Sequence, residues 1–145
     1  MKIVLMSIRP RYSRRIFDGQ KRFELRRTPV RLAAGDVVVV YESAPRKAIV
    51  GAFFVGEVHR RAVRCMWRDL GSELGVSDEE YWAYFDGAET AHAIEVCKVV
   101  EVDPVPLEKL RERFDGFRPP QSYMFWNDAL DRLVGRTAAR AITAA

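Results

Sequence analysis

Two apolar stretches that lie close together in the sequence constrain the fold most strongly. Residues 36–42 (DVVVVYE) form a nearly continuous apolar run, which is typical of a strand covered on both faces. Residues 48–58 (AIVGAFFVGEV) predict a longer strand, in which Gly51 and Gly56 indicate a bulge or a close backbone approach. Together they predict a well-buried sheet at the centre of the molecule.

Further strands are expected on either side of this pair. Residues 2–8 (KIVLMSI) read as a buried strand. Residues 91–103 predict a long strand, which Pro104 and Pro106 end. One face of that strand is expected to carry its apolar side chains, Ile94, Val96, Val100 and Val102.

Short helices separate these strands. Pro10 suits a first helical turn that Ser7 is placed to cap, and Gly19 is a good helix stop. Ser77 and Glu80 form a Ser-x-x-Glu capping box, which predicts a helix from Ser77 to about Phe85. Other helices are expected at residues 63–74, 107–113 and 127–134.

The order of these elements lacks the regular βαβ rhythm of a parallel sheet, so the sequence predicts an α+β fold with a small curved sheet or barrel. A chain of 145 residues is expected to form one domain, here residues 1–145. The Ala-rich end, from about residue 136 to residue 145, is expected to fray. Four large aromatic side chains are assigned to the core rather than to base stacking: Trp67, Trp82, Phe85 and Trp126.

Charge is distributed unevenly along the chain. The net charge is +4, yet the first 31 residues carry ten Lys or Arg and only two acids. Residues 69–103 carry ten acids and one Lys. Such polarisation is expected of a polyanion-binding face with an acidic back, and the alternative is chance clustering of surface charges. A second basic group comprises Arg46, Lys47, Arg60, Arg61, Arg64 and Arg68.

Composition excludes several classes. With 48% hydrophobic and 30% charged residues, the chain resembles ordinary soluble globular proteins. No apolar run reaches the length of a membrane span, and the opening residues lack a signal peptide's apolar core, so a cytoplasmic location is expected. Two Cys and two His occur singly, without metal-ligand spacing. We therefore expect reduced thiols, no metal site and no cofactor; the sequence does not indicate an oligomeric partner.

The stretch DGQKRFELRR, residues 18–27, holds four basic residues and two acids, and places Glu24 among the basic residues. On a regular strand, Phe23 and Leu25 face the core while Glu24 lies on the other face between Arg22 and Arg26. Such a carboxylate beside cations suits recognition of a base edge with phosphate held nearby, or shared acid and base roles with Lys21. The remaining alternative is an exposed ladder of ion pairs.

The same region resembles the opening signature of the ASCH domains, a branch of the PUA-like superfamily. The resemblance rests on SIRPRYSRRIFDGQKRFELRR, with Ser7-Ile8-Arg9-Pro10-x-Tyr12 followed by Gly19-x-Lys21-x-x-Glu24-x-Arg26. YESAPRKAIVGAFFVGEV and PPQSYMFW resemble two later blocks of the family. The resemblance covers most of residues 1–126.

The resemblance implies a small, curved, mixed β-barrel of PUA-like type flanked by helices, with a cleft beside the first helix. Related domains bind RNA or modified bases, and some members are N4-acetylcytidine amidohydrolases or ribonucleases. The amidohydrolases use a Lys, a Thr and a more distal Glu. Lys21 matches the Lys and Glu73 is a plausible distal Glu, but Glu24 stands where those enzymes have Thr. The chain therefore either binds only, or uses Glu24 differently.

We thus expect an RNA- or nucleotide-binding protein with a basic cleft; the alternative is a metal-independent hydrolase acting on a modified nucleoside or on RNA. Catalytic candidates, if it is an enzyme, are Lys21, Glu24 and Glu73. Candidate ligand-binding residues are Arg9, Tyr12, Lys21, Arg22, Glu24, Arg26, Tyr41, Ser43, Lys47, Gln121 and Ser122.

Overall fold

The computed structural model describes residues 1–125, in which strands and helices are mixed without regular alternation. The strands are β1 (Ile3–Ile8), β2 (Phe23–Arg26), β3 (Val37–Glu42), β4 (Ala48–Ala62), β5 (Thr90–Pro106) and β6 (Tyr123–Phe125). The helices are α1 (Pro10–Phe17), α2 (Val63–Leu70), α3 (Asp78–Tyr84) and α4 (Leu107–Arg113), with a 3₁₀ turn at Gly71–Glu73.

These elements confirm the predicted α+β class. None of the described helices is long and apolar enough to cross a membrane. The helix predicted at residues 127–134, the frayed tail and Trp126 lie outside the described residues. The assignment of residues 1–145 to one domain therefore stays a prediction.

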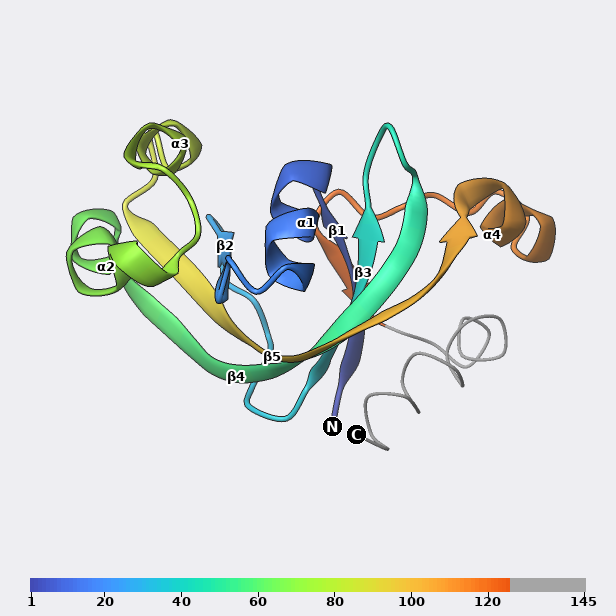
Figure 1. Cartoon of the computed structure of the whole chain (residues 1–145), viewed down its shortest axis with the longest axis horizontal. Coiled ribbons are helices and arrows are strands. Elements are labelled where there is room, and N and C mark those ends of the chain that lie inside the picture. The colour runs from blue at the N-terminus through green and yellow to red at the C-terminus, as the bar shows by residue number, and fades with distance from the viewer. Residues whose placement is uncertain (126–145) are drawn as a thin grey trace.

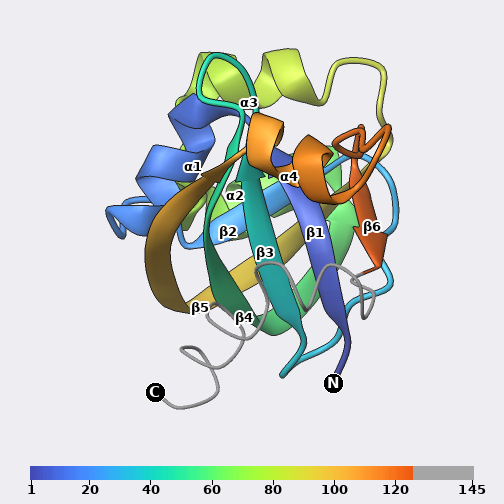
Figure 2. The same cartoon turned by 90° about the vertical axis from the view of Figure 1, so that its right-hand side faces the viewer.

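The described strands form one sheet in the order β2-β5-β4-β3-β1-β6. β1 and β3 are parallel, and the other neighbours are antiparallel. The long strands β4 and β5 form a curved ribbon with α2 and α3 at one end and α4 at the other (Figure 1). Figure 2 shows β3, β1 and β6 side by side, with α4 near their upper ends.

The sheet has the expected curvature, but it is not closed into the predicted barrel. Its edges are β2 and β6, which are only four and three residues long, and no ladder joins them in the described part of the chain. In place of a ladder, Nη2 of Arg26 on β2 donates to the carbonyl oxygen of Ser7 on β1 at 2.9 Å. A side chain of the β2 edge therefore reaches β1, the strand beside the β6 edge.

Irregular pairing bends β4 and β5. Their register shifts between Ile49 and Gly51, between Ala52 and Phe54, and between Val55 and Val58. A Cβ on Gly51 would lie 2.4 Å from the carbonyl oxygen of Val100 and 2.7 Å from the Phe17 ring. The glycine thus lets α1 approach the sheet closely, which confirms the close approach predicted from sequence.

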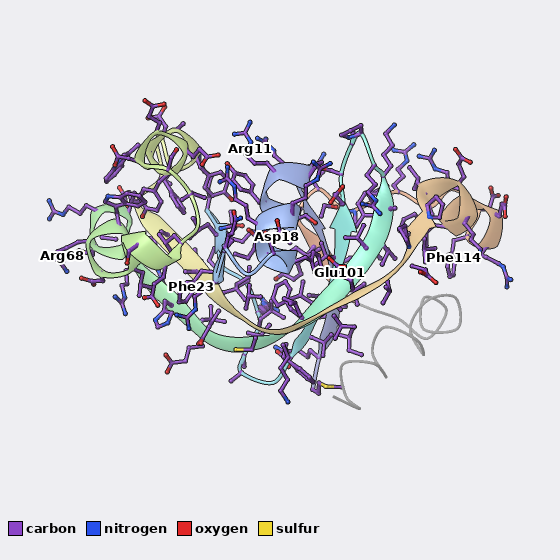
Figure 3. All side chains as sticks on the ribbon, in the orientation of Figure 1. Arg11, Asp18, Phe23, Arg68, Glu101 and Phe114 are labelled. Atoms are coloured by element: carbon purple, nitrogen blue, oxygen red, sulfur yellow. The ribbon has the colours of Figure 1, made fainter. Side chains whose placement is uncertain are left out.

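Apolar side chains pack on both faces of the sheet and at one end (Figure 3). Val38 and Val40 pack in the cluster that includes Ile16 of α1, whereas Val37 and Val39 pack in the cluster that includes Leu110 of α4. β3 is therefore covered on both faces, as its apolar run predicts. A third cluster joins α2 and α3 to Phe23 and Leu25, which are both 6% exposed.

β5 differs from its prediction in two respects. It continues through Pro104 to Pro106, because β2 pairs only with the first half of β5 and leaves this later part as a sheet edge, where a missing N–H is tolerated. Its apolar residues also divide between the two sides of the sheet, with Ile94 and Val96 in the α1 cluster and Val100 and Val102 in the α4 cluster. The change follows Lys98, whose φ of 44° interrupts the regular alternation.

Helix ends are partly as predicted. Ser77 accepts from the backbone N–H of Glu80, and the Glu80 side chain returns the bond, so the capping box is confirmed. Ser7 does not cap α1, because its hydroxyl donates instead to the carbonyl oxygen of Pro120 at 2.6 Å.

The prediction that Trp82 belongs to the core is wrong, because this side chain is 43% exposed. Cys65 and Cys97 are free and half-buried.

Candidate functional site

A pocket of about 490 Å³ lies where β1 and β3 end, beside β2. Its wall is completed by α1, β2, α3 and the segment from Pro119 to Gln121. This volume lies in the range of about 300–1,000 Å³ that is typical of small-molecule sites. Nine of the predicted site residues line it: Arg9, Tyr12, Lys21, Glu24, Arg26, Tyr41, Ser43, Lys47 and Gln121.

Lys21 is a buried cation in this wall, with 2% of its surface exposed. Nζ donates to the carbonyl oxygens of Phe23 at 2.5 Å and Leu74 at 3.1 Å. It also lies 5.6 Å from the centre of the Tyr12 ring, within range of a cation–π interaction. Burial lowers the pKa of Lys21 to about 8, although the nearby Glu24 carboxylate favours the charged form.

A glycine brings the covering loop onto Lys21. Gly75 has a φ of +67°, and a Cβ there would lie 2.6 Å from Cα of Lys21. A larger residue at position 75 would therefore be strained and would collide with the backbone beside the pocket.

Glu24 is also buried, at 4% exposure. Oε1 accepts from the Leu25 N–H at 3.0 Å, and Oε2 accepts from Nη2 of Arg26 at 3.4 Å. The exposed ion-pair ladder considered from sequence is thus wrong for Glu24. Arg22 points away and pairs with Glu73 at 2.9 Å, in a contact where both side chains are exposed. Neither Arg22 nor Glu73 lines the pocket.

Arg26 links β2 to β1 and to the segment that precedes β6. Besides Ser7 it contacts the Ser122 hydroxyl at 3.5 Å, so Ser122 supports the pocket wall without lining it. The backbone N–H of Ser7 donates to the carbonyl oxygen of Ser122 at 3.1 Å, which fastens this segment to β1. Nε of Arg26 is buried and has no hydrogen-bond partner among the described residues. It is therefore an unsatisfied donor in the pocket wall, where buried polar groups are normally paired.

The rim is formed where β3 ends. The Ser43 N–H donates to the carbonyl oxygen of Ile8 at 3.0 Å, which joins the ends of β1 and β3. Tyr41 is 2% exposed, and burial raises its pKa despite the opposing charge of Arg111. Lys47 follows in the hairpin loop with a φ of 50°.

Tyrosines of α3 form a wall that the sequence analysis missed. Tyr81 and Tyr84 both line the pocket. The Tyr84 hydroxyl donates to the carbonyl oxygen of Leu25 at 3.1 Å, and the Tyr81 hydroxyl donates to that of Val63. The sequence did offer a signal for this wall: Tyr81 and Tyr84 are three residues apart in the helix that the capping box opens, which places both on one side of α3.

Glu80 of α3 also lines the pocket and organises two arginines of α1. It accepts from Arg15 at 2.8 Å and from Arg11 at 3.1 Å. The hydrogen bond from Arg15, followed by the Ser77 backbone bond, lowers the pKa of Glu80 to about 2.

Much of the N-terminal positive charge is therefore used within the protein. Seven of its ten basic side chains donate to other groups of the chain, and Arg9, Arg14 and Arg31 show no such bond among the described residues. The pocket itself is lined by four basic and two acidic side chains. It can hold a ligand that offers both acceptors and donors, with negative charge toward the rim.

Comparison with known proteins gives consistent matches. The sequence model of the ASCH domain matches residues 6–116. An ASCH domain-containing ribonuclease from Zymomonas mobilis is 29% identical over 121 residues, which cover 83% of this chain and 82% of that protein. The crystal structure of ASCH from Zymomonas mobilis superposes with a TM-score of 0.85 at 26% identity, covering 92% of this chain and 93% of the other.

Two further matches add detail. A structure of a Tyr-to-Phe variant of the Zymomonas mobilis protein has a TM-score of 0.84 at 26% identity, covering 91% of this chain and 95% of the other. The large ribosomal subunit protein uL22 of Ureaplasma parvum is 29% identical over 93 residues, covering 63% of this chain and 29% of that protein.

Proposed function

This chain belongs to the ASCH domain family, and from that premise we propose that its pocket binds one nucleotide of a single-stranded RNA. The observation that carries the proposal is the group formed by buried Lys21 and Glu24 with the largely buried Arg26, in a pocket of about 490 Å³. Burying three charged side chains is costly unless they are paired or used. An RNA-related function agrees with the name of the ribonuclease relative.

The base is expected to meet Glu24 and Arg26. The Glu24 carboxylate has about four acceptor positions, of which the Leu25 N–H and Arg26 occupy two. The unpartnered Nε of Arg26 adds a donor. An acceptor next to a donor complements a base edge that carries an amino group beside a ring nitrogen or carbonyl oxygen.

The sugar-phosphate backbone is expected to lie along the rim. Arg9 and Lys47 both line the pocket and make no side-chain hydrogen bond in the described part of the chain, so their charges remain available for phosphate. Tyr12 offers an aromatic ring inside the pocket, which suits stacking on a base.

Fluorescence anisotropy with a labelled single-stranded RNA tests this proposal. Arg9→Ala and Lys47→Ala should weaken binding, and each lost phosphate contact should reduce the salt-dependence slope by about 0.7. Arg68→Ala is the matched control, because Arg68 is an exposed cation that bonds Asp69 away from the pocket. Equal binding by the rim variants and the control, or binding insensitive to salt, would contradict the proposal.

RNA cleavage is a second candidate, which the presence of Lys21 and Glu24 in one pocket favours. In such a reaction the ribose 2′-hydroxyl attacks the adjacent phosphorus and its proton passes to a base such as Glu24. The bond to the 5′-oxygen breaks as that oxygen takes a proton from water, which leaves a 2′,3′-cyclic phosphate and a free 5′-hydroxyl. Lys21 in its protonated form would stabilise charge on the phosphate, and its pKa of about 8 sets the pH range of that role. Activity should then fall as the pH rises above 8.

Glu24→Gln separates binding from catalysis. For a binding protein, the variant should change base preference, since an amide keeps one acceptor and adds a donor, and neither protein should turn over RNA or N4-acetylcytidine. For an enzyme, the wild type should release product and the variant should lose about 10²–10⁴ in rate while still binding. Glu73 is an unsuitable catalyst, because it lies outside the pocket wall and pairs with Arg22.

A further inference from the structure

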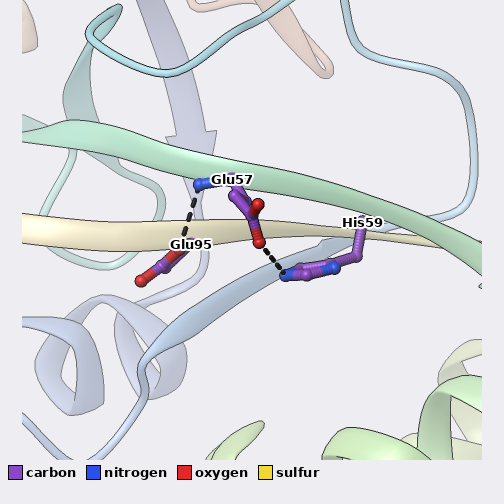
Figure 4. A group of neighbouring side chains, drawn as sticks. All are labelled: Glu57, His59 and Glu95. Carbon is purple, nitrogen blue, oxygen red and sulfur yellow. Dashed lines mark hydrogen bonds and ion pairs between the residues drawn. The ribbon is translucent and has the colours of Figure 1, made fainter.

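A second cluster of chemically active side chains lies on β4 and β5, away from the pocket. It comprises Glu57 and His59 of β4 and Glu95 of β5, and none of the three lines the pocket. One ligand atom from each residue lies within 4.8 Å of the others. Figure 4 shows the Glu57 carboxylate meeting the His59 ring and the Glu57 backbone meeting Glu95.

A β-bulge brings these groups together. Val55 pairs with Val96 but Val58 pairs with Ile94, so Gly56 and Glu57 stand opposite the single residue Glu95. The N–H of Glu57, released from the regular ladder, donates to Oε2 of Glu95 at 3.0 Å. Bulges commonly redirect a side chain in this way.

Gly56 leaves the space that the Glu95 carboxylate occupies. A Cβ at position 56 would lie 2.6 Å from Oε2 of Glu95 and 2.9 Å from Sγ of Cys97. Any other residue would displace the carboxylate or the bulge. The bulge and the glycine therefore act together to hold Glu95 beside Glu57 and His59.

His59 is oriented by its neighbours. Its ring packs edge-on against Phe23, with the ring centres 5.7 Å apart. Nε2 lies 3.5 Å from Oε2 of Glu57, while Nδ1 lies 3.4 Å from Nη2 of Arg61. Arg61 also holds Asp69 at 2.8 Å, so it keeps a partner if the weaker contact to His59 is lost.

We propose that Glu57, His59 and Glu95 bind a divalent metal ion of the zinc type. One imidazole and two carboxylates are a donor set that Zn²⁺ accepts, with water completing the coordination. Nε2 of His59 would bind the metal, which transfers its proton to Nδ1 and turns Arg61 fully toward Asp69. The ion joins β4 to β5 where their hydrogen-bond ladder is interrupted.

Zinc titration of the untagged, metal-free full chain tests the proposal by isothermal calorimetry and thermal unfolding. The wild type should bind one ion and melt at a higher temperature with zinc than without it. Glu57→Gln, Glu95→Gln and His59→Phe should each lower the affinity at least about tenfold. Glu57 is exposed, and Phe at position 59 keeps a ring against Phe23, so these two variants are expected to fold.

Glu101→Gln is the matched control, because it removes a carboxylate from β5 outside the cluster. It should bind zinc like the wild type. The proposal is overturned if the wild type shows no saturable 1:1 binding, or if the three cluster variants bind as well as Glu101→Gln does.

Discussion

Two ion pairs begin within three residues of one another and differ in almost every physical respect. In the first pair, the side chains of Glu24 and Arg26 are 6% and 12% exposed. In the second pair, the side chains of Arg22 and Glu73 are 63% and 40% exposed. Water screens the second pair and leaves it weak, while the first must be satisfied by the protein itself. Identical charge chemistry in one short stretch therefore has different consequences, and burial is the cause.

The buried pair should show the largest effect. Glu24→Ala removes the partner of Arg26 and leaves a buried cation together with the Leu25 N–H, so we expect a loss of about 3–5 kcal/mol. Urea unfolding measures this free energy. Glu24→Gln keeps one acceptor oxygen, so its free energy of unfolding should fall clearly less than that of Glu24→Ala. Equal losses for the two variants would mean that the hydrogen bonds to this acceptor do not contribute to stability.

Lys21 sharpens the comparison through its pH dependence. Its folded-state pKa is about 8 against an ordinary value of 10.5, so the unfolded chain binds more protons between these values. Stability contributed by this group therefore rises with pH from about 8 to 10.5, by up to about 3 kcal/mol.

The measurement is the difference in unfolding free energy between wild type and Lys21→Met across that window. Taking the difference cancels the contribution of the tyrosines to the pH dependence of stability. Their pKa values are raised, to about 12 for Tyr81, so above pH 10 they lower stability as the pH rises. A constant difference from pH 8 to 10.5 would mean that Lys21 titrates normally.

The ion pairs of Glu80 are intermediate in exposure between the buried pair and the exposed pair. Its lowered pKa, about 2 against 4.5, means that its contribution is present above pH 4.5 and lost as the pH falls to 2. Because the pairs with Arg11 and Arg15 are partly exposed to solvent, we expect only about 1 kcal/mol from Glu80→Gln at neutral pH. Acid unfolding of the variant should start from lower stability and show a shallower slope in that range.

The exposed pair should show the smallest effect. Arg22→Ala and Glu73→Ala should each change the unfolding free energy by about 0.2–1 kcal/mol, and less at high salt. Neither should alter RNA binding, because neither residue lines the pocket. A loss as large as that of Glu24→Ala would remove the distinction between the two pairs.

The local pattern of the sequence was sufficient to predict most of the strands and helices. The valine run of β3, the capping box of α3 and the alternation that buries Phe23 and Leu25 depend on neighbours within a few residues. The motif around Lys21 and Glu24 also indicated the family, which the match to residues 6–116 confirms. These features were predictable because the backbone geometry of a strand or helix has a fixed period.

Contacts between distant segments decided what those elements do. Glu24 is buried in a pocket wall that it shares with residues of α3 and the segment from Pro119 to Gln121. The alternation of a strand does not specify whether its second face is covered. Arg26 of β2 bonds Ser7 of β1 across 19 residues of sequence, and Glu95 lies beside Glu57 and His59 at a bulge. The sequence by itself determined the elements and which residues carry charge; the tertiary structure decided which charges are shielded from water, because shielding depends on how remote segments pack together.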